Sequence, residues 1–212
     1  MHLLLVTALS LVVLAAFLIL IQLHRLGTPP MPSNPRTRAA VLTLLSDLRD
    51  GSRHTCPASA GQPGAFQASP RPPRRIYELG SGWGGLSRRI AREHPDTPVV
   101  GVERSLVPWL FSTLVLAVCG PSNLGFRFAD LTTLSFGEPQ RRGDSTCPEA
   151  ADGPEVIIAY LSSRHMERLA AMLPAGHDII VISAAFALPG RRPDREIRVR
   201  DMYRTPVYRY DL

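Results

Sequence analysis

Four glycines within six residues stand behind an apolar run in the stretch RIYELGSGWGGLS, which covers residues 75–87. Glycine adopts backbone conformations that are closed to other residues, and its missing side chain lets a ligand approach the main chain. A loop of this kind between a strand and a helix is typical of cofactor sites. Gly80, Gly82 and Gly85 spell GxGxxG, whereas Gly80, Gly82 and Gly84 spell GxGxG. Two binding motifs therefore overlap in one loop.

An acidic residue follows the loop at the spacing that adenosine cofactors require. Glu103 ends the apolar run PVVGVE, residues 98–103, and lies 19 positions after Gly84. A carboxylate at the tip of a second strand can accept both ribose hydroxyls of an adenosine. GxGxxG is the fingerprint of dinucleotides and GxGxG that of S-adenosylmethionine (SAM), and Glu103 suits both. The alternative for Glu103 is a solvated loop glutamate.

Two further carboxylates favour SAM over a dinucleotide. Glu78 lies two residues before Gly80, where it can attract the ammonium group of methionine but would repel a pyrophosphate. Asp130 ends the run RFAD, from which it can accept the amino group of adenine. Trp83 either covers the methionine part of SAM or packs under the following helix. We therefore predict a SAM site rather than that of a nicotinamide oxidoreductase, formed by Glu78, Gly80, Ser81, Gly82, Trp83, Gly84, Glu103 and Asp130.

The elements that must position these residues alternate between strands and helices. Continuous apolar runs predict strands, and apolar residues at helical spacing predict helices between them, so we expect a parallel sheet covered on both faces. A short turn without a helix joins the last two strands, which predicts an antiparallel pair at the sheet edge. The predicted strands are residues 76–79, 99–102, 126–129, 156–160, 178–184, 196–202 and 207–210, and the predicted helices are residues 86–94, 107–118 and 164–173.

An uncharged segment opens the sequence. Residues 3–23 contain only three polar side chains, and a helix of that length spans the hydrocarbon core of a bilayer, which is about 30 Å thick. A cleaved signal peptide is the alternative, but the apolar run is longer than in signal peptides and no basic residue precedes it. We predict a retained transmembrane anchor at residues 1–25. The basic residues that follow predict a single-pass membrane protein with its main domain in the cytoplasm. We expect the membrane to be the inner membrane of a prokaryote.

Two further segments precede the predicted domain. The stretch 26–49 is rich in proline at its start and continues as a helix over residues 35–49, with Ser33 or Asn34 as its N-cap. Residues 50–75 are dense in Pro, Gly, Ser and Ala, which predicts a flexible linker. We expect one domain over residues 76–212, with a second flexible insertion at about 137–154.

The composition argues against several other functions. The net charge is +6, and all 24 basic residues are arginine, because the sequence contains no lysine. The arginines are scattered without interleaved aromatic residues, so no nucleic-acid partner is expected, and the excess positive charge suits anionic lipid. Cys56, Cys119 and Cys147 lie far apart, and no histidine stands at ligand spacing. This pattern predicts no disulfide framework and no metal site, and it favours a reducing compartment.

These motifs together resemble a known family. ELGSGWGG, GVE, FADL and the final strand pair resemble the class I SAM-dependent methyltransferases over residues 76–212. The apolar N-terminal segment, the helix before the glycine loop and residues 108–110 are similar to the small membrane-anchored protein-lysine methyltransferases that modify the ATP synthase c-subunit and the adenine nucleotide translocase, and to their prokaryotic relatives. That family carries an Asn directly before the Pro-Trp pair, where this chain has Val107. The resemblance implies an α/β fold with a seven-stranded Rossmann-like sheet, SAM as cofactor, and N-methylation of a lysine in a membrane protein.

Methyl transfer makes few demands on the acceptor side of the site. SAM supplies the reactivity in an in-line displacement, so the protein has to align the reactants and favour a neutral amine. Tyr160 and Ser162 follow the fourth strand, where their oxygens can orient an amine, and we name them as candidate catalytic residues. The alternative is that Tyr160 packs against a helix and Ser162 caps one. His94, His165 and His177 are scattered and are predicted to be surface or capping residues.

Two other functions stay open from the sequence. A methyltransferase near a bilayer can act on a lipid or a lipophilic small molecule, and a chain with this loop can be a non-catalytic, membrane-anchored SAM-binding scaffold. Label confined to the lipid fraction would favour the first, and binding of SAM without turnover would favour the second.

Overall fold

The computed structural model describes residues 34–49, 72–137, 153–174 and 176–212, together with residues 4–7, 9, 10, 12, 13 and 17. The predicted linker and insertion lie outside these residues except at their ends, and so does most of the predicted anchor. The residues described between 4 and 17 are helical and exposed. Within the described part of the chain, no helix is both long enough and apolar enough to cross a membrane.

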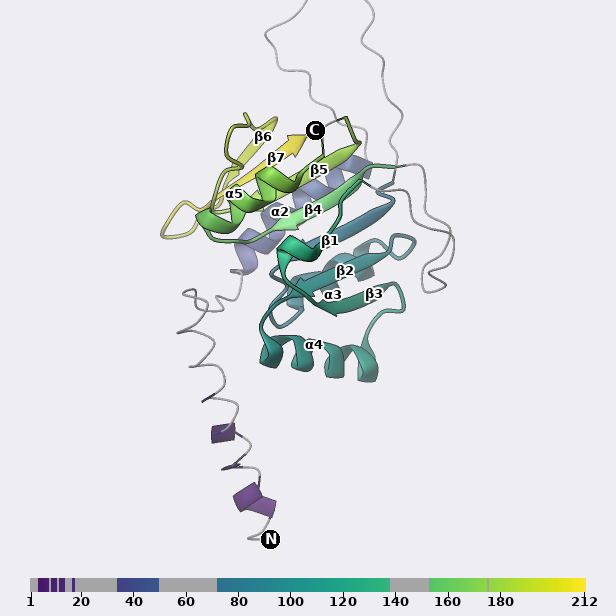
Figure 1. Cartoon of the computed structure of the whole chain (residues 1–212), viewed down its shortest axis with the longest axis vertical. Helices are drawn as coiled ribbons and strands as arrows, with labels where there is room; N and C mark the ends of the chain where they lie inside the picture. The colour runs from purple at the N-terminus through teal and green to yellow at the C-terminus, as the bar shows by residue number, and fades with distance from the viewer. Residues whose placement is uncertain are drawn as a thin grey trace, which may run out of the picture.

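Strands and helices alternate along the chain as the apolar pattern predicts (Figure 1). The helix predicted at residues 35–49 has those bounds, and Asn34 caps it because the backbone amide of Arg36 donates to its Oδ1 atom at 3.1 Å. The other elements differ from their predicted bounds by a few residues. In chain order they are α2 (Pro35–Arg49), β1 (Arg75–Leu79), α3 (Gly85–Glu93), β2 (Val99–Glu103), α4 (Leu106–Cys119), β3 (Leu124–Phe128), η1 (Leu131–Thr133), β4 (Glu155–Ala159), α5 (Ser163–Met172), β5 (Ile179–Ala184), β6 (Arg195–Arg198) and β7 (Pro206–Asp211).

The seven strands form one mixed sheet in the order β3-β2-β1-β4-β5-β7-β6. β1 to β5 are parallel, and β7 runs antiparallel between β5 and β6. The prediction of a parallel sheet with an antiparallel pair at one edge is therefore confirmed. The strand order reverses between β1 and β4, and sheets of this kind bind ligands beside such a switch point, at the carboxyl ends of their strands.

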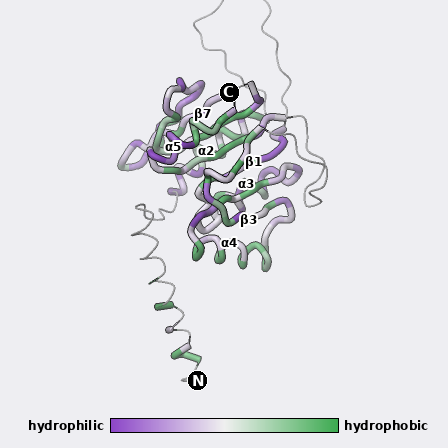
Figure 2. Tube along the Cα trace, viewed as in Figure 1, coloured by the Kyte–Doolittle hydropathy of each residue, from purple (hydrophilic) through white to green (hydrophobic). Residues whose placement is uncertain are grey.

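Two apolar cores lie on opposite faces of the sheet (Figure 1). α2 and α3 cover one face, where Leu45 and Ile90 pack with Ile182 of β5. α5 and η1 cover the other face, where Met166 packs with Val181. The central strands are buried on both faces, which explains their continuous apolar runs. α4 lies beyond the edge strand β3, and Figure 2 shows that it is hydrophobic along most of its length.

α2 packs on the same sheet as the segments that follow it. Leu45 is fully buried in the core that α2 shares with β5 and β7. Two polar contacts join α2 to the C-terminal strands, because the Arg36 guanidinium donates to the carbonyl of Arg200 and Arg195 forms a salt bridge with Asp47. The position of α2 over the sheet is thus fixed by both apolar and charged groups.

β6 is shorter than predicted. It ends at Arg198 rather than at residue 202, because the carboxylate of Asp201 accepts hydrogen bonds from the amide and the hydroxyl of Thr205, at 2.9 and 2.7 Å, and turns the chain. Arg204 in this turn has a φ angle of 49°, in the left-handed region. The turn carries residues 203 and 205 toward the carboxyl ends of the parallel strands.

Replacing Leu45 by alanine should lower the free energy of unfolding by about 2–5 kcal/mol, because it deletes a fully buried side chain and leaves a cavity. Urea unfolding of the full chain in mild detergent, followed by circular dichroism, measures the change. Ser46→Ala is the matched control, since Ser46 is exposed on the same helix, and it should change the free energy by less than about 0.5 kcal/mol. Equal effects of the two substitutions would contradict the packing of α2 on the sheet.

Candidate cofactor and acceptor site

A cavity of about 850 Å³ lies at the carboxyl ends of β1, β2 and β4. Its volume is in the range of small-molecule sites. The glycine loop borders it on one side and the segment after β4 on the other. The site residues predicted from the sequence line it with the exception of Gly84, and they are Glu78, Gly80, Ser81, Gly82, Trp83, Glu103, Asp130, Tyr160 and Ser162.

The glycine loop is held against the end of β2 by main-chain hydrogen bonds. The amides of Gly80 and Ser81 donate to the carbonyl of Val102 at 2.9 and 3.0 Å. Gly80 and Gly84 have φ angles of 74° and 70°, where any side chain would strain the backbone. A Cβ atom at Gly84 would also lie 2.4 Å from the ring of Phe126. The conformation of the loop therefore requires glycine at these two positions.

Glu103 fixes the loop from the tip of β2. Its Oε2 atom accepts a hydrogen bond from the Gly82 amide at 2.8 Å, and its Oε1 atom accepts one from the Ser105 amide at 2.6 Å. The side chain is buried but lines the cavity. Because each carboxylate oxygen has two lone pairs, Glu103 can still accept hydrogen bonds from the hydroxyl groups of a ligand while it holds the loop.

Glu78 faces the α2 and α3 layer beneath the loop and is buried. Burial raises the pKa of its carboxyl from 4.5 to about 7, against the hydroxyl and amide of Ser87 and the charge of Arg38, which lower it. The Ser87 hydroxyl donates to Oε2 of Glu78. Gly101 leaves room for this contact, because a Cβ atom there would lie 2.9 Å from the Ser87 hydroxyl. Glu78 is therefore a carboxyl that changes charge near neutral pH and that a cation would ionise.

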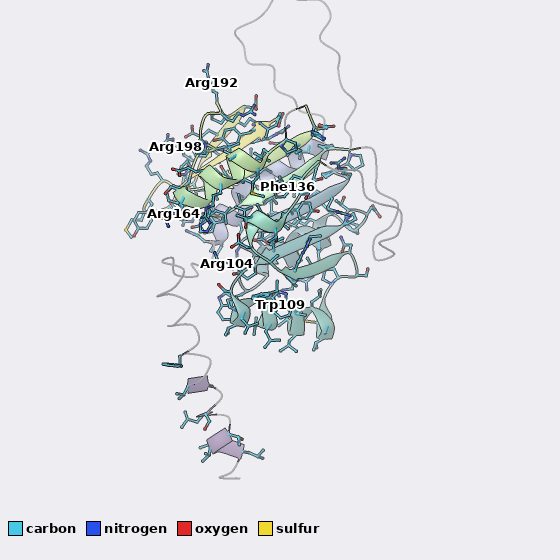
Figure 3. All side chains as sticks on the ribbon, in the orientation of Figure 1. Arg104, Trp109, Phe136, Arg164, Arg192 and Arg198 are labelled. Atoms are coloured by element: carbon cyan, nitrogen blue, oxygen red, sulfur yellow. The ribbon has the colours of Figure 1, made fainter. Side chains whose placement is uncertain are left out.

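Asp130 carries a fixed negative charge on the cavity wall. Its Oδ1 atom accepts hydrogen bonds from the amide and the hydroxyl of Thr132, both at 2.9 Å, and its Oδ2 atom lies 2.9 Å from Nη1 of Arg104. The Thr132 amide is the largest cause that lowers the pKa of Asp130 below its usual value, and its hydroxyl and Arg104 act in the same direction. Arg104 follows β2 at the approach to α4 (Figure 3). A ligand that hydrogen-bonds to Asp130 therefore shares it with Arg104.

The loop residues between the glycines fit a polar ligand with an apolar part. The Ser81 hydroxyl is buried and has no hydrogen-bond partner among the described residues, so it is available to a ligand. Trp83 lines the cavity and packs edge-to-face on Phe111 of α4, with ring centroids 5.3 Å apart. With the open glycine backbone and Glu103, these groups fit the methionine and ribose parts of SAM.

The side of the cavity opposite the glycine loop holds a hydroxyl and an imidazole in contact. Oγ of Ser162 lies 2.8 Å from Nδ1 of His165, and both residues line the cavity together with Tyr160. Ser162 is the N-cap residue of α5, but its hydroxyl makes no capping bond. Burial lowers the pKa of His165, and the charge of Arg168 lowers it further, so the imidazole is neutral at pH 7.

His165 is half-buried and contacts the side chain of the N-cap residue Ser162, but it also lines the cavity, which the prediction of a surface or capping residue did not include. It lies in the first turn of α5, where the switch-point geometry brings it to the cavity. His94 is the C-cap residue of α3, as one of the two predicted roles requires, and His177 is exposed.

Several cavity residues carry no local signal in the sequence. Arg38 comes from α2, and a Cβ atom at Gly85 would lie 3.0 Å from its guanidinium. Phe186 follows β5, and Tyr203 and Thr205 come from the turn between β6 and β7. Their approach depends on contacts between distant elements, which spacing along the chain does not reveal.

In the part of the chain that the structure describes, no group of three or more His, Cys, Asp or Glu side chains is placed to hold a metal. Cys119 is exposed and free, while Cys56 and Cys147 lie outside the described residues.

Comparisons with solved structures bear on the fold. An RNA methyltransferase from Salinibacter ruber, in complex with S-adenosyl-L-homocysteine, matches with a TM-score of 0.55 and 20% identity over 85% of this chain and 93% of its own. The fold is that of the class I methyltransferases. A mutant of MtNAS in complex with SAM matches with a TM-score of 0.52 and 11% identity over 82% of this chain and 60% of its own. No protein-family model and no curated protein matches the sequence.

These neighbours support SAM as the cofactor, because they were solved with SAM or with its demethylated product. They do not identify the acceptor. The roles of the individual site residues, and the absence of a nucleic-acid partner, stay predictions.

Glu103→Gln should weaken SAM binding by about tenfold or more, because hydrogen bonds to a charged group contribute about 1.5–3 kcal/mol each. Isothermal titration calorimetry on the full chain in detergent measures the affinity. Glu93→Gln is the control, since Glu93 pairs with Arg89 on the exposed side of α3 and should leave binding unchanged. An unaltered affinity in a folded Glu103→Gln protein would remove Glu103 from the site.

SAM affinity should rise by about tenfold between pH 5.5 and pH 7, because Glu78 ionises with a pKa of about 7 and its charge attracts the methionine ammonium. This window lies below the pKa of an α-amino group, about 8, so the ligand keeps its charge. Titrations of wild type and Glu78→Gln at several pH values test the assignment. The pH dependence should disappear in Glu78→Gln, and its persistence there would assign the effect to another group.

Proposed function

We propose that this chain is a SAM-dependent methyltransferase that N-methylates a lysine side chain of a membrane protein at the bilayer surface. The observation that carries the proposal is one cavity that holds a glycine loop with buried carboxylates on one side and hydroxyl and imidazole groups on the other. The class I fold supports the reaction type, and the resemblance found in the sequence supports the acceptor.

The cofactor side of the cavity binds and orients. SAM, when bound, supplies an activated methyl group on a sulfonium centre. Glu103 accepts hydrogen bonds from the ribose hydroxyls, and Asp130 accepts one from the adenine amino group. The negative charge of Glu78 neutralises the ammonium of the methionine part. The Ser81 hydroxyl donates to the ligand or accepts from it. These contacts hold the sulfonium methyl group in line with the attacking amine, and this alignment is what a displacement reaction requires most.

The acceptor side favours a neutral amine. A lysine in water is protonated, with a pKa of about 10.4, and entry into a partly apolar cavity lowers that value. The oxygens of Tyr160 and Ser162 accept hydrogen bonds from the amine and point its lone pair toward the methyl group. His165 lies one hydrogen bond beyond Ser162 and is neutral at pH 7, so it can take up the proton that the amine loses.

The membrane location is supported by the N-terminal segment. Residues 3–23 are uncharged, and His24, Arg25, Arg36 and Arg38 follow them. We place the chain in the inner membrane of a prokaryote as a single-pass protein with the catalytic domain in the cytoplasm. An anchor there restricts acceptors to those at the bilayer surface.

Membranes from cells that lack the gene should gain label from radioactive SAM when the purified full chain is added, and the label should lie in a small hydrophobic protein. Mass spectrometry should then find methyl increments on lysine. Because the chain itself has no lysine, methyl-lysine in the digest cannot come from the added enzyme, and an increase over untreated membranes identifies the acceptor.

The Glu103→Gln protein is the control and should transfer little label. Label found only in the lipid fraction would replace the lysine acceptor by a lipid. Binding of SAM without transfer to any membrane fraction would instead favour the scaffold.

A further inference from the structure

α4 is apolar along most of its length. Its sequence LVPWLFSTLVLAVC contains no charged residue. The hydroxyls of Ser112 and Thr113 both donate to the carbonyl of Trp109, at 2.8 and 2.9 Å, so they satisfy themselves on the helix. A helix that is hydrophobic on all sides is normally covered on all sides, by protein or by lipid.

The residues that the structure describes cover one side of this helix. Among the residues of α4, only Pro108 and Ser112 are buried, and the helix packs on β3 and β2. Phe128 of β3 continues the exposed surface, because its ring lies 5.4 Å from that of Trp109. We call the exposed surface the α4 face, which consists of Leu106, Leu110, Phe111, Leu114, Val118 and Phe128, each between 44% and 85% exposed.

The α4 face is small for an interface between two proteins. Six partly exposed side chains on and beside this 14-residue helix form an accessible patch of roughly 500 Å². A stable protein interface needs about 800 Å² on each partner. A lipid surface sets no such minimum, because each apolar side chain that enters it contributes separately.

The sequence places a bilayer within reach of this face. Residues 26–34 connect the proposed anchor to α2, and nine residues span at most about 32 Å. The domain therefore stays near the membrane surface, and the net charge of +6 favours an anionic leaflet.

We propose that the α4 face inserts into the acyl-chain boundary of the bilayer and holds the domain flat against the membrane. This rests on the proposed membrane anchoring and adds a second contact to it. Phe111 belongs to the α4 face and packs on Trp83 of the glycine loop, so the docked surface borders the cofactor cavity. Docking would place that cavity beside the lipid surface, where a membrane-protein lysine lies.

The test uses the full chain with Cys56, Cys119 and Cys147 replaced by serine and reconstituted into vesicles of phosphatidylcholine and phosphatidylglycerol. A nitrobenzoxadiazole label is attached through Leu114→Cys on the α4 face, or through Arg192→Cys at the opposite end of the sheet (Figure 3). Lipids with spin-labelled acyl chains should quench the label at position 114 severalfold more than the label at 192. Aqueous iodide should show the reverse order.

A second substitution makes the result specific to the α4 face. Leu110→Glu, added to the position-114 variant, should reduce docking by a factor of about ten or more, since it removes a leucine from the apolar contact and adds a charge. Leu110→Met is the matched control and should keep the quenching. SAM titration and circular dichroism confirm that each protein is folded.

Equal quenching by lipid at both positions overturns the docking. Self-quenching between labels at position 114 without quenching by lipid also overturns the docking, because it would assign the α4 face to contact with a second copy of the chain. Extraction of the vesicles with alkaline carbonate separates the two proposals. A chain that is released has no anchor, whereas a chain that is retained without lipid quenching at position 114 keeps the anchor and lacks only the docking.

Discussion

The carbonyl of Val102, at the end of β2, accepts hydrogen bonds from two consecutive amides at the end of β1. This contact fixes where the first strand stops and how the glycine loop departs from it. Glu103, the next residue, then lies close enough to hold the Gly82 amide, so one strand end positions both the loop and a carboxylate that lines the cavity. β4 lies on the other side of β1 from β2. The chain after β1 continues into α3 on one face of the sheet, and the chain after β4 continues into α5 on the other face, so a cavity remains between the two connections.

The burial of the Glu78 carboxyl links the glycine loop to the helices beneath it. Glu78 and Gly101 are neighbours in register, and the missing side chain of Gly101 admits Ser87, whose hydroxyl contacts Glu78. The carboxyl is thereby placed in a dry layer between the sheet and α3, where its ionised form is costly. Arg38 of α2, which lies 40 residues before Glu78 in the chain, supplies part of the compensating charge. α2 therefore contributes to the electrostatics of the loop as well as to the apolar core.

Much of this could be predicted from the sequence, for identifiable reasons. Strands buried on both faces carry continuous apolar runs, so β1, β2, β4 and β5 could be predicted from the sequence. The glycine loop and Glu103 could be predicted because their spacing is typical of adenosine cofactor sites. The end of β6 was not visible, because it depends on side-chain hydrogen bonds of Asp201 within the turn. His165 and Arg38 were not identified as cavity residues, because helices that are far apart in sequence bring them there. For Trp83 the sequence left two roles open, a cover for the methionine part of SAM and packing under α3. The ring lines the cavity and packs on Phe111 of α4.

The place of β7 in the sheet has a consequence for how the chain folds. β7 pairs with β5 on one side and β6 on the other, and both of those strands precede it in the sequence. During synthesis β5 therefore emerges with a free, apolar edge, and β6 emerges with no strand to pair with. Such an edge can join the edge of another unfinished chain until Val207 and Tyr210 close it. The last strand of the sheet therefore protects the fold against aggregation as well as completing it, and any chain in which β7 is not yet paired leaves the edge of β5 exposed.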